Sequence, residues 1–220
     1  MLNSFCRKKD MNSHNKGRNI NTVIFDFGGV LAEKGFEEGL RAVAVRHGLD
    51  EAAFYSLARD LIYSTGYLTG HTGEHMYWQM IRDKTGIEDD DTVLRNEILS
   101  RFVLRPWMFD IVRELRAIGI GVAILSDQTN WLDELNEQYD FFKYFDVVFN
   151  SYHIGKSKVD PTHFSDTAYR LNHAPQEMLF IDDSEAHCQR ARNMGMEAIC
   201  YVDRNLFFKE IKGFCPIVRQ

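Results

Sequence analysis

Five short apolar runs alternate with longer amphipathic stretches along most of the chain. The runs are rich in Val, Ile and Phe, and they occupy residues 21–27, 121–127, 146–151, 178–183 and 197–202. Short runs of this composition predict β-strands that are buried on both faces. Most of them end on or beside a polar residue, so the same pattern places polar side chains where strands end.

Between the later runs, the apolar positions follow a helical period. Residues 106–120 begin at a proline and carry apolar side chains at 108, 111, 112, 115 and 118, which is typical of a helix with one buried face. Residues 161–172 also open on a proline, and residues 184–195 run from a capping serine to a glycine. Alternation of strand and helix predicts an α/β fold, with a Rossmann-like, doubly wound parallel sheet.

The segment between the first two runs has a different pattern. It contains four amphipathic helical stretches and no strand signal, at residues 36–49, 50–66, 72–86 and 89–103. We therefore expect an α/β core domain formed by residues 21–34 and 104–220, with an inserted four-helix cap domain at residues 35–103. Residues 1–20 are polar and basic, which predicts a disordered tail.

Composition narrows the function classes. The chain has 220 residues, of which 45% are hydrophobic, enough for a packed core and a smaller lobe. A net charge of −6 without a basic block beyond the tail argues against nucleic acid as a partner. No apolar run is long enough to cross a membrane. The four cysteines share no CxxC spacing, which favours free thiols and a cytoplasmic location. Oligomeric state is left open.

Right-handed crossovers bring the carboxyl ends of parallel strands to one edge, where ligands bind in open α/β sheets. The side chains expected there are Asp26, Ser126, Asp127, Asp182 and Asp183, together with Lys158 from the loop that follows the run at 146–151. Clustered carboxylates repel one another and call for a cation, and oxygen-rich sites suit Mg²⁺. Lysine, serine and metal together would neutralise a phosphoryl group while Asp26 attacks phosphorus.

Four segments carry a family resemblance. FDFGGVL (25–31), ILSD (124–127), GKSKVDP (155–161) and FIDDSEAH (180–187) occur in this order. They resemble the four motifs of the haloacid dehalogenase-like (HAD) hydrolase superfamily, and the inserted helices look like its four-helix cap. Within the superfamily, the chain looks most like the branch of sugar-1-phosphate phosphatases and the amino-terminal phosphatase-like domain of soluble epoxide hydrolase.

This resemblance implies a Mg²⁺-dependent phosphatase that acts on a small phosphorylated metabolite. Asp26 would be the nucleophile and form an aspartyl-phosphate, while Ser126 and Lys158 complete the catalytic set. The implied substrate-binding residues are Ser126, Asp127 and Lys158. The implied metal ligands are Asp26, Asp182, Asp183 and the main-chain carbonyl of Gly28.

Gly28 is also a departure, because most phosphatases of this superfamily carry at that position the aspartate that protonates the leaving group. The glycine predicts a preference for anomeric, acyl or aryl phosphates, whose leaving groups depart without a proton. Glu33 and Asp127 are candidates for a replacement acid by proximity in sequence. Two alternatives stay open: a catalytically impaired binding or regulatory protein, and a haloacid dehalogenase, since halide also leaves without a proton.

Other chemically suggestive residues have simpler interpretations. His71 and His75 lie four residues apart, but Gly73 stands between them and no third ligand is near, which favours a surface role over zinc binding. Trp131 is expected in the core or against the cap. His187 is expected to support the site without contacting substrate.

Overall fold

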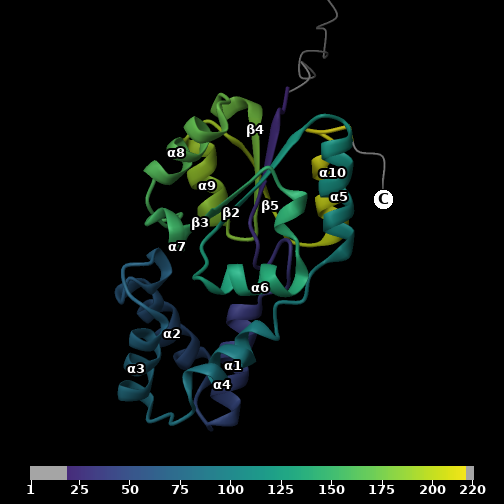
Figure 1. Ribbon diagram of the computed structural model, residues 1–220. Coiled ribbons are helices and arrows are strands. Elements are labelled where there is room, and N and C mark those ends of the chain that lie inside the picture. Colours follow the sequence, from purple (N-terminus) through teal and green to yellow (C-terminus); the bar gives the residue numbers. More distant parts are fainter. Residues whose placement is uncertain (1–18, 217–220) are drawn as a thin grey trace, which may run out of the picture.

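A single parallel sheet organises the computed structural model, which describes residues 19–216 (Figure 1). Its strands lie in the order β3-β2-β1-β4-β5, and every neighbouring pair is parallel. Their bounds are β1 Thr22–Phe25, β2 Gly121–Ser126, β3 Val147–Asn150, β4 Met178–Asp182 and β5 Glu197–Cys200. This arrangement confirms the predicted α/β class and its parallel sheet.

Helices cover both faces of the sheet, so the core has three layers (Figure 1). Side chains alternate along each strand. Val23 and Phe25 pack with α5 (Pro106–Ala117) and α10 (Arg204–Ile211), whereas Ile24 packs with α8 (Thr162–Leu171) and α9 (Glu185–Asn193). Because β1 lies at the centre and is buried on both faces, the residue that follows it is held firmly in place.

Four helices follow β1 and lie to one side of the three-layered core (Figure 1). They are α1 Gly35–Arg46, α2 Glu51–Ser64, α3 Glu74–Thr85 and α4 Asp91–Leu99, with a short 3₁₀ turn, η1 Tyr67–Thr69, after α2. Helix α1 packs closely on both α2 and α4, and Gly39 allows the α4 backbone at Ile98 to approach. We refer to this group, residues 35–99, as the helical layer.

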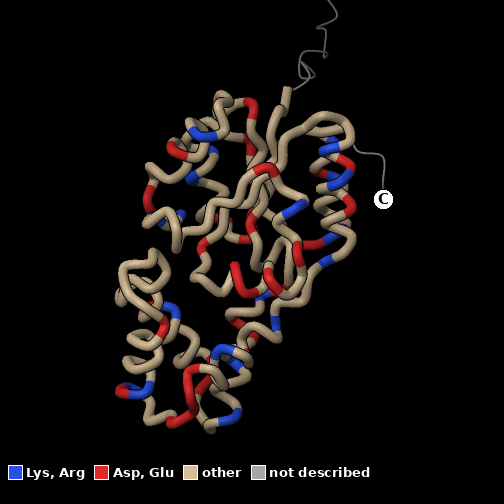
Figure 2. The backbone as a smooth tube through the Cα atoms, viewed as in Figure 1, with Lys and Arg blue, Asp and Glu red and all other residues tan. Residues whose placement is uncertain are grey.

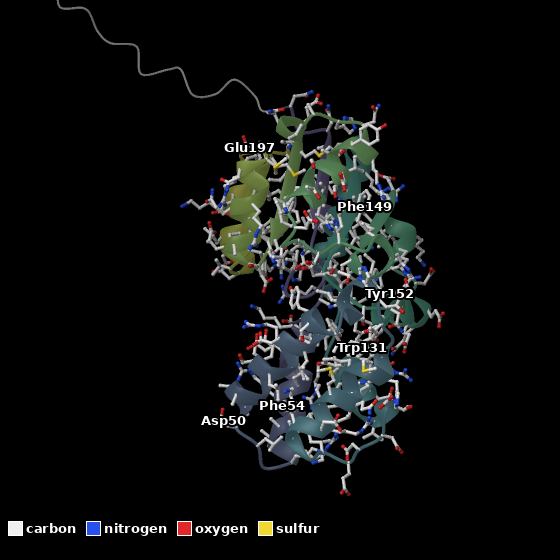
Figure 3. The ribbon with its side chains drawn as sticks, turned by 90° about the vertical axis from the view of Figure 1, so that its left-hand side faces the viewer. Asp50, Phe54, Trp131, Phe149, Tyr152 and Glu197 are labelled. Carbon is white, nitrogen blue, oxygen red and sulfur yellow. The ribbon has the colours of Figure 1, made fainter. Side chains whose placement is uncertain are left out.

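Aromatic packing joins the helical layer to the core. Trp131, the first residue of α6 (Trp131–Tyr139), is fully buried. Its ring stacks on Trp78 at 5.9 Å and meets Tyr67 edge-on at 5.7 Å. Tyr152, in α7 (Ser151–Ile154), meets Tyr67 edge-on at 6.0 Å. Figure 3 shows Trp131 and Tyr152 near the boundary between the two parts. Trp131 therefore is a buried contact with the helical layer, as the sequence indicated.

Some features differ from the sequence prediction or fall outside it. Helices α6, α7 and α10 were not predicted: α7 is a single turn directly after β3, and α6 and α10 are short helices that begin soon after β2 and β5. Ile20, assigned to the tail, is buried in the core, so the packed chain begins before residue 21. Residues 1–18 of the predicted tail lie outside the described residues. Within residues 19–216, no helix is long and apolar enough to cross a membrane.

Candidate active site

The carboxyl ends of the three central strands meet at one edge of the sheet. Asp26 follows β1, Ser126 ends β2 and Asp182 ends β4. Strands β2 and β4 both pair directly with β1. Asp183, one residue further, joins Asp26 and Asp182 in a group whose carboxylate oxygens lie within 4.8 Å of one another. Figure 2 shows acidic positions at this end of the sheet, where it faces the helical layer.

Lys158 neutralises much of this negative charge through contacts with Asp26 and Asp182. Its side chain is completely buried, and its Nζ donates to Oδ1 of Asp26 at 2.8 Å and to Oδ2 of Asp182 at 2.6 Å. The loop that carries it, between α7 and α8, is fixed because the backbone N–H of Lys158 donates to Oδ1 of Asp127 at 2.8 Å. Burial without these partners would be costly for an ammonium group.

The three charges shift one another's ionisation. Burial raises the pKa of Asp26 to about 7, with Lys158 opposing and the neighbouring carboxylates adding to the increase. Burial also favours protonation of Asp182, but Lys158 and His187 outweigh it and hold its pKa below the usual range. Burial lowers the pKa of Lys158, yet Asp182 and Asp26 together raise it above its ordinary value. Lys158 therefore stays charged. Its contact lowers the pKa of Asp182 below the usual range, whereas the pKa of Asp26 remains raised.

Hydrogen bonds leave one oxygen of Asp26 available. Its Oδ1 accepts from the Phe27 backbone N–H at 2.7 Å as well as from Lys158. Its Oδ2 accepts no hydrogen bond from the residues that the structure describes. Both oxygens of Asp182 are engaged, since Oδ1 accepts from the Ser184 backbone N–H at 2.8 Å. Of these two aspartates, Asp26 is therefore the one that has an oxygen free of hydrogen bonds.

That space is a cavity of about 350 Å³ between the strand ends and the helical layer. The predicted site residues that line it are Asp26, Gly28, Ser126, Asp127 and Asp183. Lys158 and Asp182 lie buried beneath it, joined to Asp26 by the contacts above. The structure therefore brings all the predicted site residues together at one place.

A second cavity, of about 790 Å³, adjoins the first. The two share lining from the helical layer and from the core: Phe36, Tyr55, Asp127, Gln128 and Ser184. The larger one extends between α2 and α9, with Tyr63 on one side and Arg190 on the other. A group held at Asp26 would therefore have room to extend along the boundary between helical layer and core.

Residues with weaker predictions fall in different places. Lys156, the neighbour that competed with Lys158, pairs at the surface with Asp166 at 2.6 Å. His187 contacts Asp182 at 3.3 Å, and it also lines the larger cavity. His71 contacts Thr69 and His75 contacts Asp91, and no metal-type cluster of the described residues includes either histidine.

The two candidate acids also separate. Asp127 lines both cavities and accepts a 3.4 Å hydrogen bond from the Tyr63 hydroxyl. Glu33 lines neither cavity, because Arg105 holds both of its oxygens at 2.8 and 2.7 Å. Proximity in sequence was misleading for Glu33. The chain turns away from the site after Gly29, and Arg105 holds the Glu33 side chain outside both cavities.

Sequence reasoning missed several residues of the cavities. Lys34 lines the smaller one, and its Nζ lies 2.6 Å from Oδ2 of Asp183. Gln128 lines both, as does Tyr55, one of the aromatic residues whose orientation the sequence left open. Lys34 and Gln128 are close in sequence to motif residues, so this proximity could have identified them. The orientation of the Tyr55 side chain depends on how the helices pack.

The fold and the site together place the protein among α/β proteins that carry a strand-end aspartate beside a buried lysine. A model of the haloacid dehalogenase-like hydrolases matches residues 20–195. The chain belongs to the haloacid dehalogenase-like hydrolase family.

Curated relatives share parts of the chain. The phosphoglycolate phosphatase of Salmonella typhimurium is 31% identical over 98 residues, which cover 44% of this chain and 39% of that protein. Acyl-CoA dehydrogenase family member 10 of Mus musculus is 26% identical over 208 residues, which cover 87% of this chain and 19% of that protein. The chain thus spans well under half the length of these relatives.

Solved structures share the fold. A HAD family enzyme from Bacteroides thetaiotaomicron superposes with a TM-score of 0.70 at 23% identity, covering 88% of this chain and 99% of that one. The same enzyme in complex with magnesium and inorganic phosphate gives 0.68 at 21% identity, covering 86% and 99%. L-2-haloacid dehalogenase from Xanthobacter autotrophicus gives 0.61 at 18% identity, covering 88% and 82%.

Proposed function

We propose that the protein is a Mg²⁺-dependent phosphatase that hydrolyses a small phosphorylated metabolite through an aspartyl-phosphate at Asp26. The observation that carries this proposal is the contact of buried Lys158 with both Asp26 and Asp182, beside Asp183 and below a cavity. A nucleophilic carboxylate, a fixed ammonium group and an acidic cluster are the parts that phosphoryl transfer to an aspartate requires.

In the first step, Oδ2 of Asp26 attacks phosphorus while Oδ1 keeps its hydrogen bonds from Lys158 and from the Phe27 backbone N–H. The new O–P bond forms as the bond between phosphorus and the leaving-group oxygen breaks, and that oxygen keeps the electron pair. In the second step, a water oxygen bonds to phosphorus while the bond between phosphorus and Oδ2 of Asp26 breaks. Inorganic phosphate leaves with the two water protons, and the Asp26 carboxylate is regenerated. The hydrogen bonds to Oδ1 orient the carboxylate for both steps.

Other core residues act on the phosphoryl group and the substrate. The Lys158 ammonium compensates charge on the phosphoryl oxygens next to Asp26. Ser126, which lines the same cavity, donates a hydrogen bond from its hydroxyl group to a phosphoryl oxygen. Asp127 contacts the substrate where the cavities meet, and its carboxylate fixes the backbone of the Lys158 loop.

The residues present fit a magnesium ion. Asp26, Asp182 and Asp183 offer carboxylate oxygens within 4.8 Å of one another, and such hard oxygen donors suit Mg²⁺. We assign the ion to these three residues and to the Gly28 carbonyl. When bound, it would supply positive charge to the phosphoryl oxygens and keep Asp26 ionised by lowering its pKa.

Gly28 favours substrates whose leaving group is already stabilised. A glycine donates no proton, and Glu33 is held by Arg105 away from both cavities. Gln128, whose Nε2 lies 3.8 Å from where a Cβ on Gly28 would be, donates a hydrogen bond but no proton. We therefore propose anomeric, acyl or aryl phosphates as the substrate class, selected by the helical layer through the larger cavity.

A screen of phosphate release tests the proposal. The panel holds anomeric sugar phosphates, acyl and aryl phosphates, simple alkyl phosphates, and phosphoglycolate because curated relatives bear that name. We expect release that requires Mg²⁺, stops with a chelator, and falls by about 10³-fold or more in Asp26→Asn. Release that persists in that variant or in chelator would contradict the mechanism. No release from any compound would favour a binding protein.

A further inference from the structure

The larger cavity holds an arginine whose charge has no partner within the described part of the chain. Most described arginines lie within 4.0 Å of a carboxylate, as Arg41, Arg82 and Arg105 do. Arg190, in the last turn of α9, has no carboxylate at that distance and no hydrogen bond from its side chain among residues 19–216. It is only partly exposed and it lines the cavity.

The acidic groups of that cavity are committed elsewhere. Asp127 accepts the backbone N–H of Lys158 and the hydroxyl of Tyr63. Asp60 faces Arg59, one residue away, at 3.6 Å. His187, one turn before Arg190 on α9, contacts Asp182. Arg190 is therefore a cation at the cavity wall that the neighbouring carboxylates leave uncompensated.

The remaining walls are largely apolar or aromatic: Phe36, Tyr55, Ile62, Tyr63, Leu68 and Val159. Walls of this kind fit the faces of a ring, with few polar groups to fix its orientation. Ser184, at the start of α9, lines both cavities. Six residues at 1.5 Å rise place Arg190 about 9 Å further along that helix, a distance that a ring-sized leaving group can span.

We propose that Arg190 binds a second anionic group, a carboxylate or a phosphate, at the far end of a ring-sized leaving group. This inference rests on the proposed function, because it requires the first phosphoryl group to lie at Asp26. A guanidinium group matches the two oxygens of a carboxylate or phosphate with parallel N–H donors. The substrate is then a phosphate ester with anionic groups at both ends of an aromatic or sugar ring.

Matched aryl phosphates test the role of Arg190. 4-Carboxyphenyl phosphate and 4-carbamoylphenyl phosphate share a ring and a phenolic leaving group, and only the first carries a second anion. 1,4-Phenylene bisphosphate separates phosphate from carboxylate as the preferred group. We expect the protein to show a kcat/KM at least tenfold higher for an ester that carries the second anionic group than for the carbamoyl ester, as for a charge-assisted hydrogen bond.

Variants assign that preference to the arginine. We expect Arg190→Gln to reduce the ratio of kcat/KM values at least tenfold, mainly through KM, and Arg190→Lys to retain part of it because charge remains without the planar fork. Arg170→Gln is the matched control, since Arg170 is exposed on α8 and lines neither cavity. Equal ratios in Arg190→Gln and the unaltered protein would overturn the proposal.

A binding measurement separates this inference from the proposed function. Calorimetric titration of 4-carboxyphenyl phosphate into Asp26→Asn, with Mg²⁺ present, needs no turnover. We expect Arg190→Gln in that background to weaken binding at least tenfold, with Arg170→Gln giving the same affinity as Asp26→Asn alone. Absence of phosphate release with this dependence intact would contradict the phosphatase and support Arg190. Binding that is indifferent to Arg190 would overturn the inference even if phosphate is released.

Discussion

Nζ of Lys158 lies 2.8 Å from Oδ1 of Asp26, and the lysine side chain is completely buried. Removing the ammonium in Lys158→Met would leave Asp26 and Asp182 facing each other without compensation. We expect turnover to fall by about 10³-fold or more. We also expect the free energy of unfolding to fall by about 3–5 kcal/mol, the usual result of breaking a buried ion pair. Phosphate release and urea unfolding measure the two effects.

Lys156→Met is the matched control for this variant. Lys156 lies two residues away and pairs with Asp166 outside the site, and it lines neither cavity near Asp26. We expect activity within about twofold of the unaltered protein, because surface ion pairs contribute little. If the two variants lost activity equally, the loop as a whole would matter and the ammonium of Lys158 would not be the group responsible.

The site could be predicted from the sequence because parallel strands end at a common edge. Asp26, Ser126 and Asp182 each follow an apolar run, and strand order then brings them together without further information. Lys158 was separable from Lys156 by its spacing to the following Asp-Pro. These relationships are local in sequence or fixed by sheet topology.

The cavity walls could not be predicted in the same way. Tyr55 and Arg190 lie on amphipathic helices. The apolar period of such a helix shows which face is buried, but it does not show which of the other residues face a cavity between two packed elements. Lys34 was missed because its contact with Asp183 depends on where the chain leaves the core. The hydrogen bond from Arg105 to Glu33 joins residues that are 72 positions apart in the sequence. Such contacts depend on tertiary packing.

At the proposed magnesium site, Lys34 would compete with the ion for the Asp183 carboxylate. Nζ of Lys34 lies 2.6 Å from Oδ2 of Asp183, and the lysine side chain is about half exposed at 52%. An exposed ion pair contributes on the order of 0.5–1 kcal/mol, so we expect Lys34→Gln to tighten Mg²⁺ binding about two- to fivefold. Titration calorimetry with Mg²⁺ measures this. Lys84→Gln, at an exposed position of α3, should bind as the unaltered protein does, and weaker binding in Lys34→Gln would refute the competition.

Glu33 and Arg105 hold the turn that follows β1, because Arg105 also donates to the Gly29 carbonyl at 2.5 Å. The hydrogen bonds from Arg105 lower the pKa of Glu33 below its usual 4.5. A lowered folded-state pKa means that the pair stabilises the fold fully above pH 4.5, and that this contribution is lost as pH falls through the folded-state value. The contribution is below about 1 kcal/mol because Glu33 is partly exposed.

Urea unfolding at several pH values checks this linkage. We expect Glu33→Gln to be less stable than the unaltered protein at about pH 7, with the difference shrinking below about pH 4 as the wild-type carboxylate is protonated. Glu88→Gln changes an exposed carboxylate that has no ion pair among the described residues, and it should show no such convergence. A difference that grew on acidification would mean that the sign of the shift is wrong.

In the proposed mechanism, Gly28 decides how strongly turnover depends on the leaving group. Without a proton donor, negative charge develops on the departing oxygen, so the rate should rise steeply as the leaving-group pKa falls. A proton donor at this position typically adds about 10²–10⁴-fold for poor leaving groups. A Cβ at position 28 would meet Phe102 Cε1 at 3.5 Å and Gln128 Nε2 at 3.8 Å, which are ordinary contact distances. The position therefore admits a side chain.

We accordingly expect Gly28→Asp to flatten the dependence of single-turnover phosphorylation on leaving-group pKa, by accelerating alkyl phosphates more than aryl phosphates. Gly28→Ala is the matched control, since it adds the Cβ without the carboxyl group and should keep the steep dependence. Rapid quenching over a series of aryl and alkyl phosphates measures the slope for each protein. A flat plot for the unaltered protein would mean that another acid protonates the leaving group. Asp127, which lines both cavities, would then be the residue to change, as Asp127→Asn.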